Sequence, residues 1–537
     1  MSKYEEKKHA CFEYIREVSK AKSNPRVKLL KGGSYKIKGY YLENNNLNDI
    51  RGASVNLSYV EDTVIPQIIK DAFCEECIIY NGGGNIFCIL PESADDDFAL
   101  KLEQAAQEYL IGANTAYVMM DADLEDIENR YRETMGKLEQ RLSERKKLKI
   151  ALNAKPFSKF AERGYIPWGD HGDEMIPIKA DAFTGEAICN LCKSKIAVYS
   201  MSDKNAGRTY KVCASCLHKH NIGINARNSK YVREYNSFNA DYGLKAVRCN
   251  TLSDIDDENI AVVYGDGNNM GQIIQNFDKI TDMMQFSDDV KLASNRAVFS
   301  AMRDLGITRF QVVGLGGDDV FVIVSGKIAM EFAISLIAKY NEEFRRTDEE
   351  LKDNKNPYKS TMSVGVCIAK TNTPIRIMLQ AAEDRLALAK ELAKKDNAAG
   401  CDTGSIAYVI LNDPSTAVGS EAANKFGLRT SMQPYNYNAA VQLMRMIREL
   451  AAKGNTSRIR NIYDAYCTAD TNEEAELYFK YQNARSQKTL TLPEIDGYTL
   501  QNGIYERYGE KSFIWKDIIA LWNFSETKEE YVSEESV

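Results

Sequence analysis

Apolar and polar residues follow the same order of predicted elements in two regions of the chain. In the first region four apolar runs predict strands, at residues 35–42, 77–81, 85–91 and 115–120. Residues 48–70 and 94–112 have helical patterns, and glycines at 82–84 predict a hairpin turn between the two central strands. The order β-α-β-β-α-β is that of a ferredoxin-like unit, which is a two-layer α/β domain.

The same order of elements returns between about residues 258 and 412. Strands are predicted at 261–265, 309–315, 320–326, 361–369 and 405–411, and helices at 268–304, 327–345 and 374–396. In the last of these helices, apolar residues recur at helical spacing from Ile375 to Ala389, which is typical of one buried face. The pattern therefore predicts one fold present twice at low sequence similarity.

These elements predict an α/β (α+β) protein of four domains. The two ferredoxin-like units occupy 1–150 and 241–412, a module with four clustered cysteines occupies 151–240, and a helical C-terminal domain occupies 413–537. A chain of 537 residues is long enough for several domains, because a single hydrophobic core rarely grows past about 250–300 residues.

Composition and charge argue against several classes of protein. No run of about 18 apolar residues occurs, and the first residues lack the apolar core of a signal peptide, so a cytoplasmic location is expected. The 69 Lys and Arg against 76 Asp and Glu give a net charge of −7, without the basic excess of a duplex-coating protein. None of the four histidines is followed by Asp, so a metal nuclease of the His-Asp kind is not expected.

Four cysteines form a pattern that is typical of a zinc site. Cys189-x-x-Cys192 and Cys213-x-x-Cys216 are separated by 20 residues, and each pair supplies two thiolates from one knuckle. Four protein thiolates leave no open coordination position, so a structural Zn²⁺ is predicted. The alternatives are four ordinary buried cysteines, or a site in which His218 or His220 replaces one of them.

A second pattern consists of carboxylates at the ends of two predicted strands. Gly316-Gly317-Asp318-Asp319 lies between two apolar runs, and Asp266 follows the first strand of the same unit. In a ferredoxin-like sheet the first strand lies beside the central hairpin, so the three carboxylates are expected to meet. Carboxylates suit Mg²⁺, or Mn²⁺ in its place, and two such ions catalyse nucleotidyl transfer. A solvated Asp-rich turn would use the same residues.

Residues around these carboxylates are candidates for nucleotide binding. Gly316 and Gly317 permit a tight turn and the close approach of a phosphate, and Gly267 and Asn269 precede a predicted helix start. Lys390 and Lys394 lie one turn apart on the helix 374–396 and are candidates to neutralise a triphosphate. Lysines on a helix are more often a solvated face.

With these motifs assembled, the chain resembles the large subunit of type III CRISPR effector complexes, whose paired palm domains are related to the GGDEF cyclases. The matching segments are Asp266-Gly267-Asn268-Asn269-Met270-Gly271, Gly316-Gly317-Asp318-Asp319 and the helix segment Ala382 to Lys390. By this resemblance the first unit is a non-catalytic palm, whose turn at 81–85 helps to hold the acceptor nucleotide. Lys390 contacts triphosphate, and Asn269 lies near the ribose. Asn268 stands where the family has an acidic residue.

The resemblance implies an enzyme that converts ATP to cyclic oligoadenylates in antiviral defence. It also implies guide RNA, target RNA as activator and other CRISPR effector subunits as partners. The family's N-terminal HD nuclease is not expected here, because the chain begins almost directly at the first palm. Two alternatives remain: a scaffold subunit with a weak or silent palm, and a stand-alone cyclic-dinucleotide synthase.

Overall fold

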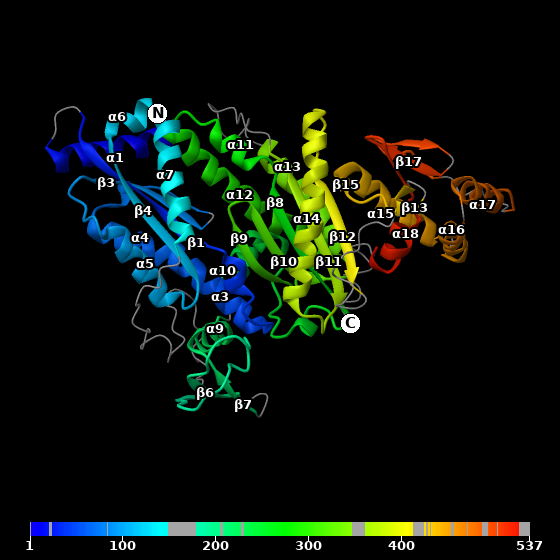
Figure 1. The fold of residues 1–537 in the computed structure, drawn as a ribbon, viewed down its shortest axis with the longest axis horizontal. Coiled ribbons are helices and arrows are strands. Elements are labelled where there is room, and N and C mark those ends of the chain that lie inside the picture. The colour runs from blue at the N-terminus through cyan, green and yellow to red at the C-terminus, as the bar shows by residue number, and fades with distance from the viewer. Residues whose placement is uncertain are drawn as a thin grey trace. The chain divides into compact units, whose positions relative to one another are not determined.

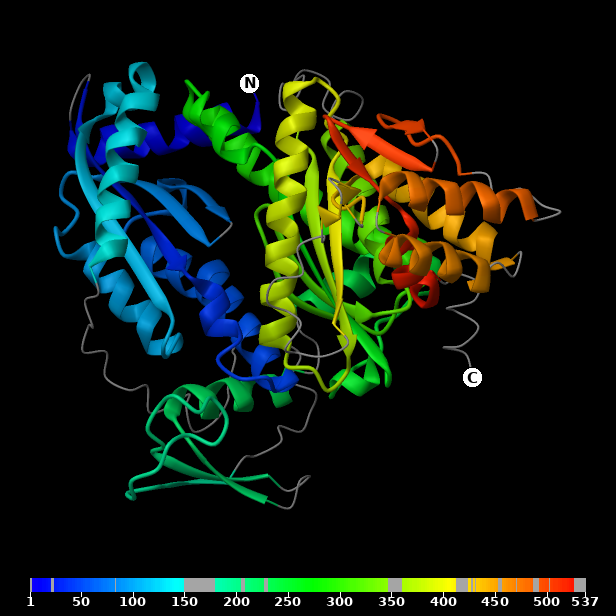
Figure 2. The same cartoon turned by 45° about the vertical axis from the view of Figure 1, so that its right-hand side comes forward.

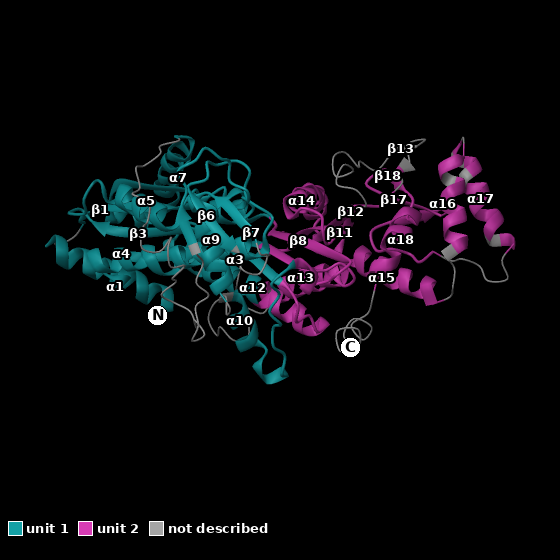
Figure 3. Cartoon of the chain, turned by 90° about the horizontal axis from the view of Figure 1, so that it is seen from below, with its two compact units in different colours: residues 1–251, 269–295, 311–319 teal, residues 252–268, 296–310, 320–537 magenta. Residues whose placement is uncertain are grey.

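The computed structural model divides into two compact units, which are described separately (Figure 3). Unit 1 comprises Met1–Thr251, Asn269–Asn295 and Gln311–Asp319, and unit 2 comprises Leu252–Asn268, Arg296–Phe310 and Val320–Val537. The structure describes residues 2–20, 24–82, 84–148, 179–203, 208–226, 230–345, 360–411, 424–425, 428–429, 431–452, 456–469, 471–485, 492–501 and 503–525. Within these ranges, no helix has the length and apolar character needed to cross a membrane.

A four-stranded antiparallel sheet forms the centre of unit 1 (Figure 1). Its strands are β1 (Arg26–Tyr35), β2 (Ile78–Gly82), β3 (Asn85–Pro91) and β4 (Asn114–Asp123), in the order β2-β3-β1-β4. The helices of this region are α1 (Lys3–Ser19), α2 (Ile37–Tyr41), α3 (Leu47–Tyr59), α4 (Ile65–Ala72), α5 (Phe98–Tyr109), α6 (Leu124–Asn129) and α7 (Tyr131–Lys147). This strand order is that of a ferredoxin-like domain, which confirms the predicted fold.

The prediction of the first strand at 35–42 was wrong. The strand β1 ends at Tyr35, and the next residues form the short helix α2. Lys28 and Lys31 interrupt the apolar pattern of β1, yet both are buried, because Lys28 is paired with Asp96 and Lys31 with Glu139. Buried lysines with acidic partners hide a strand from an analysis based on apolar runs.

The four-cysteine module of unit 1 is joined to α3 by a close helix crossing. It contains β5 (Lys179–Ala182), β6 (Tyr199–Asp203), β7 (Arg208–Val212), α9 (Ala214–Asn225) and α10 (Lys230–Phe238). A Cβ atom added to Gly52 of α3 would lie 1.9 Å from the carbonyl oxygen of Lys219, and one added to Gly223 of α9 would lie 1.7 Å from that of Asn48. Glycine on both helices therefore permits this crossing.

Unit 2 is built on a second sheet, which helix α14 covers on one face (Figure 2). Its strands are β8 (Asn259–Gly267), β10 (Asp319–Ser325), β11 (Met362–Lys370), β12 (Ser405–Leu411) and β15 (Tyr435–Asn436), in the order β15-β12-β11-β8-β10. Its helices include α13 (Ala329–Arg345) and α14 (Ile375–Ala398). The strand β12 is parallel to β11 and lies on the side of β11 away from β8.

The segments that join the two units along the chain are α11 (Met270–Gln275), α12 (Ile280–Leu305) and β9 (Gln311–Gly316). The strand β9 leads into β10 through the two-residue turn Gly317-Asp318, as the glycine pattern predicted. The boundary between the units passes between Asp319 and Val320.

The C-terminal region is helical, as predicted, but it also contains a small sheet that the sequence did not reveal. The helices are α15 (Tyr437–Ala452), α16 (Thr456–Thr468), α17 (Asn472–Arg485) and α18 (Trp515–Leu521). The strands are β13 (Asn424–Lys425), β14 (Leu428–Arg429), β16 (Thr499–Gln501), β17 (Ile504–Arg507) and β18 (Glu510–Ser512). These strands have two to four residues each, too few to produce an alternating pattern.

Candidate active site and metal centre

The hairpin that carries Asp318 and Asp319 is held by a helix of unit 1. Gly317 adopts a left-handed conformation with φ of 62°, which favours glycine because it has no Cβ atom. Its carbonyl oxygen accepts a hydrogen bond of 2.7 Å from Oγ of Ser294, a buried residue of α12. The turn is therefore fixed from outside the hairpin, and Asp318 and Asp319 are partly exposed.

The strand β9, which leads into this turn, is held by side chains that the sequence analysis did not identify. The hydroxyl of Tyr231 on α10 accepts a hydrogen bond of 3.1 Å from the backbone N–H of Leu315. Nε of the buried Arg51 on α3 donates a hydrogen bond of 3.0 Å to the side chain of Gln311. Neither residue is part of a motif, so only the tertiary structure relates them to the hairpin.

A cavity of about 670 Å³ in unit 1 opens beside Asp318. Gly317 and Asp318 line one part of it, and Gly82 and Asn85 of the first sheet's hairpin line another. Tyr80 and Phe286 contribute aromatic surface. Cavities of about 300–1,000 Å³ are typical of small-molecule sites, so this one is large enough for a nucleotide.

The cavity also contains a buried cation. Burial by itself would lower the pKa of Lys31, but Tyr80 and the paired carboxylate of Glu139 outweigh this effect and raise that pKa. Lys31 is therefore positively charged at neutral pH. A charged lysine beside aromatic and glycine surface suits a phosphorylated ligand with a planar base.

In unit 2, Asp266 and Lys390 are brought together as an ion pair. Asp266 lies near the end of β8, and its Oδ2 accepts a hydrogen bond from Nζ of Lys390 on α14. The two side chains are 25% and 31% exposed, so solvent and ligands have access to the pair. The structure thus joins two predicted site residues that are far apart in the sequence.

The register of the second sheet relates Asp266 to the hairpin. Val320 of β10 is paired with Gly265 of β8 in an antiparallel ladder. Asp266 follows Gly265, and Asp319 precedes Val320, so the two acidic residues lie at matching ends of paired strands. The sequence analysis predicted that the first strand of this unit lies beside the central hairpin, and the pairing of β8 with β10 confirms it.

Asn268 is buried in a hydrogen-bond network and is not presented as an open ligand. Its Nδ2 donates to Oγ1 of Thr361 at 2.8 Å, and its Oδ1 accepts from Oγ of Ser363 at 2.7 Å. Both polar ends of the amide are therefore satisfied within unit 2. An aspartate at this position would have no proton to donate to Thr361.

The remaining predicted nucleotide-binding residues have varied environments. Gly267 is buried at the end of β8, and Asn269 adopts a left-handed conformation with φ of 61° where α11 begins. Lys394 is exposed one turn beyond Lys390 on α14. Among the described residues, Lys390 is the nucleotide-binding candidate whose side chain donates a hydrogen bond to a predicted catalytic carboxylate, that of Asp266.

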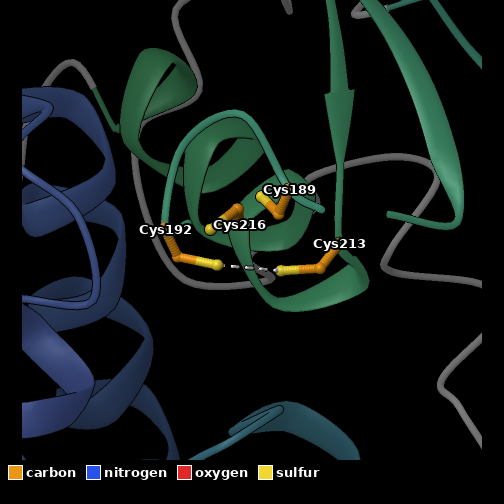
Figure 4. Close-up of side chains that lie close together, drawn as sticks. All are labelled: Cys189, Cys192, Cys213 and Cys216. Carbon is orange, nitrogen blue, oxygen red and sulfur yellow. Dashed lines mark hydrogen bonds between the residues drawn. The ribbon is translucent and has the colours of Figure 1, made fainter. Parts of the chain in front are cut away.

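The four cysteines meet in one cluster, as the spacing predicted (Figure 4). Their sulfur atoms all lie within 4.8 Å of one another, and those of Cys192 and Cys213 are 3.9 Å apart. A tetrahedral site with metal–sulfur bonds of about 2.3 Å requires sulfur atoms about 3.8 Å apart. The cluster therefore has the dimensions to hold a zinc ion.

Hydrogen bonds among the thiols shift the pKa values of Cys189 and Cys213 in opposite directions. The thiol of Cys213, with that of Cys216, holds the pKa of Cys189 well below its usual range. The same contact with Cys189 raises the pKa of Cys213 to about 12. One sulfur of the cluster is therefore stabilised as a thiolate, which is the form that binds metals.

The histidines near this cluster contact helix α3 instead of joining the cysteines. Nδ1 of His220 is 2.6 Å from Oδ1 of Asp49, and Nε2 of His218 is 3.3 Å from Nδ2 of Asn56. Both histidines are buried. The alternative of a histidine ligand is therefore not supported, because the described cluster consists of cysteines alone.

Residues 259–399 match the family model for the second palm domain of Cas10/Cmr2. This segment, which matches the palm-domain model, contains Asp266, the hairpin and Lys390. The resemblance to the large subunit of type III CRISPR effector complexes, predicted from the sequence, is thereby confirmed.

Solved structures of Csm1 are similar in fold to most of this chain. A chain of the apo Csm1–Csm4 cassette covers 88% of this chain with a TM-score of 0.55 and 15% identity, and 66% of that chain is covered in turn. The match to the cassette in complex with cA4 has a TM-score of 0.53 and 14% identity, and it covers 87% of this chain and 67% of that chain. The match to Csm1 of T. onnurineus has a TM-score of 0.52 and 14% identity, and it covers 90% of this chain and 68% of that chain.

At this identity the likeness establishes the fold alone. The protein spans about two thirds of the length of the Csm1 chains that it matches. No curated protein sequence is significantly similar to it.

Proposed function

We propose that this chain converts ATP into cyclic oligoadenylates at a site formed by Asp266, Asp318 and Asp319. The observation that supports this most strongly is the ladder between β8 and β10, with Asp266 and Asp319 directly beyond its last pair. The ladder lies in the segment that matches the Cas10/Cmr2 palm. One similar structure is a Csm1–Csm4 cassette in complex with cA4, which agrees with this product class.

The proposed reaction is attack of a ribose 3′-hydroxyl on the α-phosphate of a second ATP, with pyrophosphate as the leaving group. Asp266, Asp318 and Asp319 would hold Mg²⁺ or Mn²⁺, which lowers the pKa of the hydroxyl and neutralises charge in the transition state. Gly316 and Gly317 leave room for the phosphates to approach the hairpin. Lys390 would bind the triphosphate as a mobile positive charge.

The cavity beside Asp318 is the proposed binding site of the acceptor nucleotide. Tyr80 and Phe286 offer surfaces on which a base can stack, and Lys31 offers a positive charge. The turn of the first sheet has no carboxylate, so it can approach a phosphate without repulsion. Selection of adenine over guanine rests on the family resemblance.

The four-cysteine cluster is proposed to hold a structural Zn²⁺. With four protein sulfurs as ligands, the ion has no open position for a substrate. Elemental analysis should find one zinc per chain, and Cys213→Ser should lower the thermal stability of the protein. A zinc content well below one per chain would contradict the proposal.

Guide RNA, target RNA and other effector subunits are proposed partners of the chain. The similar Csm1 chains are in a cassette with Csm4, which supports at least one protein partner. Target RNA paired with the guide is the proposed activator of synthesis. The excess of acidic residues favours RNA contacts that are shared with partner subunits over contacts along this chain alone.

The test is an assay of labelled ATP and GTP with Mg²⁺, on the pure chain and on the complex with guide and target RNA. The double variant Asp318→Ala, Asp319→Ala should abolish product without lowering the free energy of unfolding, because adjacent carboxylates repel each other without a cation. Glu75→Ala, Glu76→Ala is the matched control, since it removes an exposed acidic pair elsewhere.

Three outcomes of this assay are distinct. Cyclic oligoadenylate that depends on the two aspartates supports the proposal. The absence of any product in the complete complex favours a scaffold subunit. A cyclic dinucleotide formed from GTP without RNA favours a stand-alone synthase.

A further inference from the structure

The ion pair between Lys390 and Asp266 joins two residues with different proposed ligands. Asp266 is assigned to a divalent cation, and Lys390 to the triphosphate, yet in this structure each is the partner of the other. Nζ of Lys390 donates its hydrogen bond to Oδ2, an oxygen that a cation would use. A lysine and a divalent cation therefore compete for the same carboxylate.

Buried polar contacts link the two backbones that carry this pair. Ser363 Oγ donates to Oδ1 of Asn268, two residues after Asp266, and lies 2.9 Å from Oγ of Ser405. Ser405 in turn donates at 2.6 Å to the carbonyl oxygen of Ala389, the residue before Lys390. The side chains of Ser363 and Ser405 are fully buried, so water does not compete for these bonds.

We propose that Lys390 is the built-in counter-ion of Asp266 and that it is exchanged for the divalent cation when nucleotide binds. This inference rests on the proposed function, because it assigns Asp266 to the cation. When the cation binds Asp266, Nζ of Lys390 is released and its flexible side chain turns to the triphosphate. Cation and nucleotide therefore bind cooperatively, and the coupling is reciprocal.

The proposal gives Asn268 a different role from the acidic residue of the family. Asn268 is a positioning residue, because its amide connects the end of β8 to the strands β11 and β12 and so to α14. Its conversion to aspartate adds a buried carboxylate and removes the donor to Thr361. Asn268→Asp should therefore weaken the coupling between cation and nucleotide instead of supplying a better cation site.

The experiment measures Mn²⁺ binding by electron paramagnetic resonance, with and without a non-hydrolysable ATP analogue. In the absence of nucleotide, Lys390→Met should bind Mn²⁺ about tenfold more tightly than the wild type, because a partly exposed competing charge is removed. With Mn²⁺ bound, the same variant should bind the analogue about tenfold more weakly, because the triphosphate loses one charge-assisted contact.

The matched control is Lys395→Met, which removes the same charge from the same helix. Lys395 is paired with Glu510 and not with Asp266, so this variant accounts for long-range electrostatics. Equal Mn²⁺ affinities of Lys390→Met and Lys395→Met would overturn the proposal. So would tighter Mn²⁺ binding by Asn268→Asp in the absence of nucleotide.

Failure of the inference can be told apart from failure of the proposed function. If Asp266→Asn abolishes Mn²⁺ binding but Lys390→Met leaves the affinity unchanged, the cation site exists and the exchange does not. If the wild type and Lys390→Met both bind no Mn²⁺ with or without the analogue, the proposed cation site itself is wrong, and the exchange falls with it.

Discussion

The two ferredoxin-like sheets place different residues at the same structural position. In the first sheet, the first residue of β3 is Asn85, and it is paired with Gly33 of β1. In the second sheet, the first residue of β10 is Asp319, and the ladder places Asp266 of β8 at the corresponding end. The topology supplies two matching strand ends, and the residues at those ends determine which chemistry is available.

Close packing explains why a glycine, Gly33, occupies this strand end in the first sheet. A Cβ atom at Gly33 would lie 1.8 Å from the carbonyl oxygen of Gly84, so the hairpin turn folds directly onto the strand. A carboxylate does not fit there. In the second sheet the same space is open enough for Asp266 and its partner Lys390. The close packing of the turn in the first sheet therefore excludes a metal-binding side chain at position 33.

The largest expected effect comes from exchanging the residues at the start of the third strand. Asp319→Asn should lower the rate of product formation by at least about 100-fold, because the cation loses a charged ligand. Adding Asn85→Asp should restore no activity, since Gly33 offers no second carboxylate. The measurement is the initial rate of cyclic product formation at saturating Mg²⁺ and ATP. Rescue by Asn85→Asp would show that the two sheets are chemically equivalent.

The second prediction concerns the packing of the turn in the first sheet. Gly33→Ala should lower the free energy of unfolding by about 2–3 kcal/mol, because the added methyl group overlaps the backbone of Gly84. Gly39→Ala is the control. It lies in α2 with no atom within 4 Å of the new Cβ, and it should stabilise the protein by up to about 1 kcal/mol. Denaturant titration measures the free energy of unfolding of both variants. Similar free energies for Gly33→Ala and Gly39→Ala would contradict the packing argument.

Most of the fold was predictable because its strands are apolar and its turns contain glycine. The second sheet has long buried runs such as β8 and β10, and both were predicted near their observed positions. The strand β1 was misplaced because two lysines occupy buried positions in it. The small C-terminal sheet was missed because its strands are too short to show a period.

The candidate site was predictable where a motif places chemistry on a strand end or a knuckle. The cysteine cluster follows directly from its spacing. The helix segment that resembles the cyclases identified Lys390 as a contact of the triphosphate, and its contact with Asp266 was not predicted. The role of Asn268 was not predictable, because its partner Ser363 lies on β11 and its partner Thr361 directly precedes that strand. Tyr231 was not predictable either, since a single tyrosine on a helix has no pattern.

The smallest expected effect concerns this tyrosine, which has no counterpart among the predicted residues. Its hydroxyl is hydrogen-bonded to the backbone of Leu315, two residues before Gly317. Tyr231→Phe removes that contact, which is worth about 1 kcal/mol, and should lower kcat about fivefold while KM for ATP stays unchanged. The reason is that the hairpin carboxylates are then held less firmly, whereas the surfaces that bind the nucleotide remain.

The matched control for Tyr231 is Tyr505. The hydroxyl of Tyr505 donates to the backbone oxygen of Pro493 at 2.7 Å, as the hydroxyl of Tyr231 donates to the backbone oxygen of Leu315 at 3.4 Å. Tyr505→Phe removes a hydrogen bond of the same kind in the C-terminal region, so it should cost similar stability and leave kcat unchanged. A steady-state analysis of both variants, beside their thermal unfolding, separates positioning from stability. If both tyrosines lower kcat equally, the effect reports general stability, and the hairpin of the second sheet does not depend on α10.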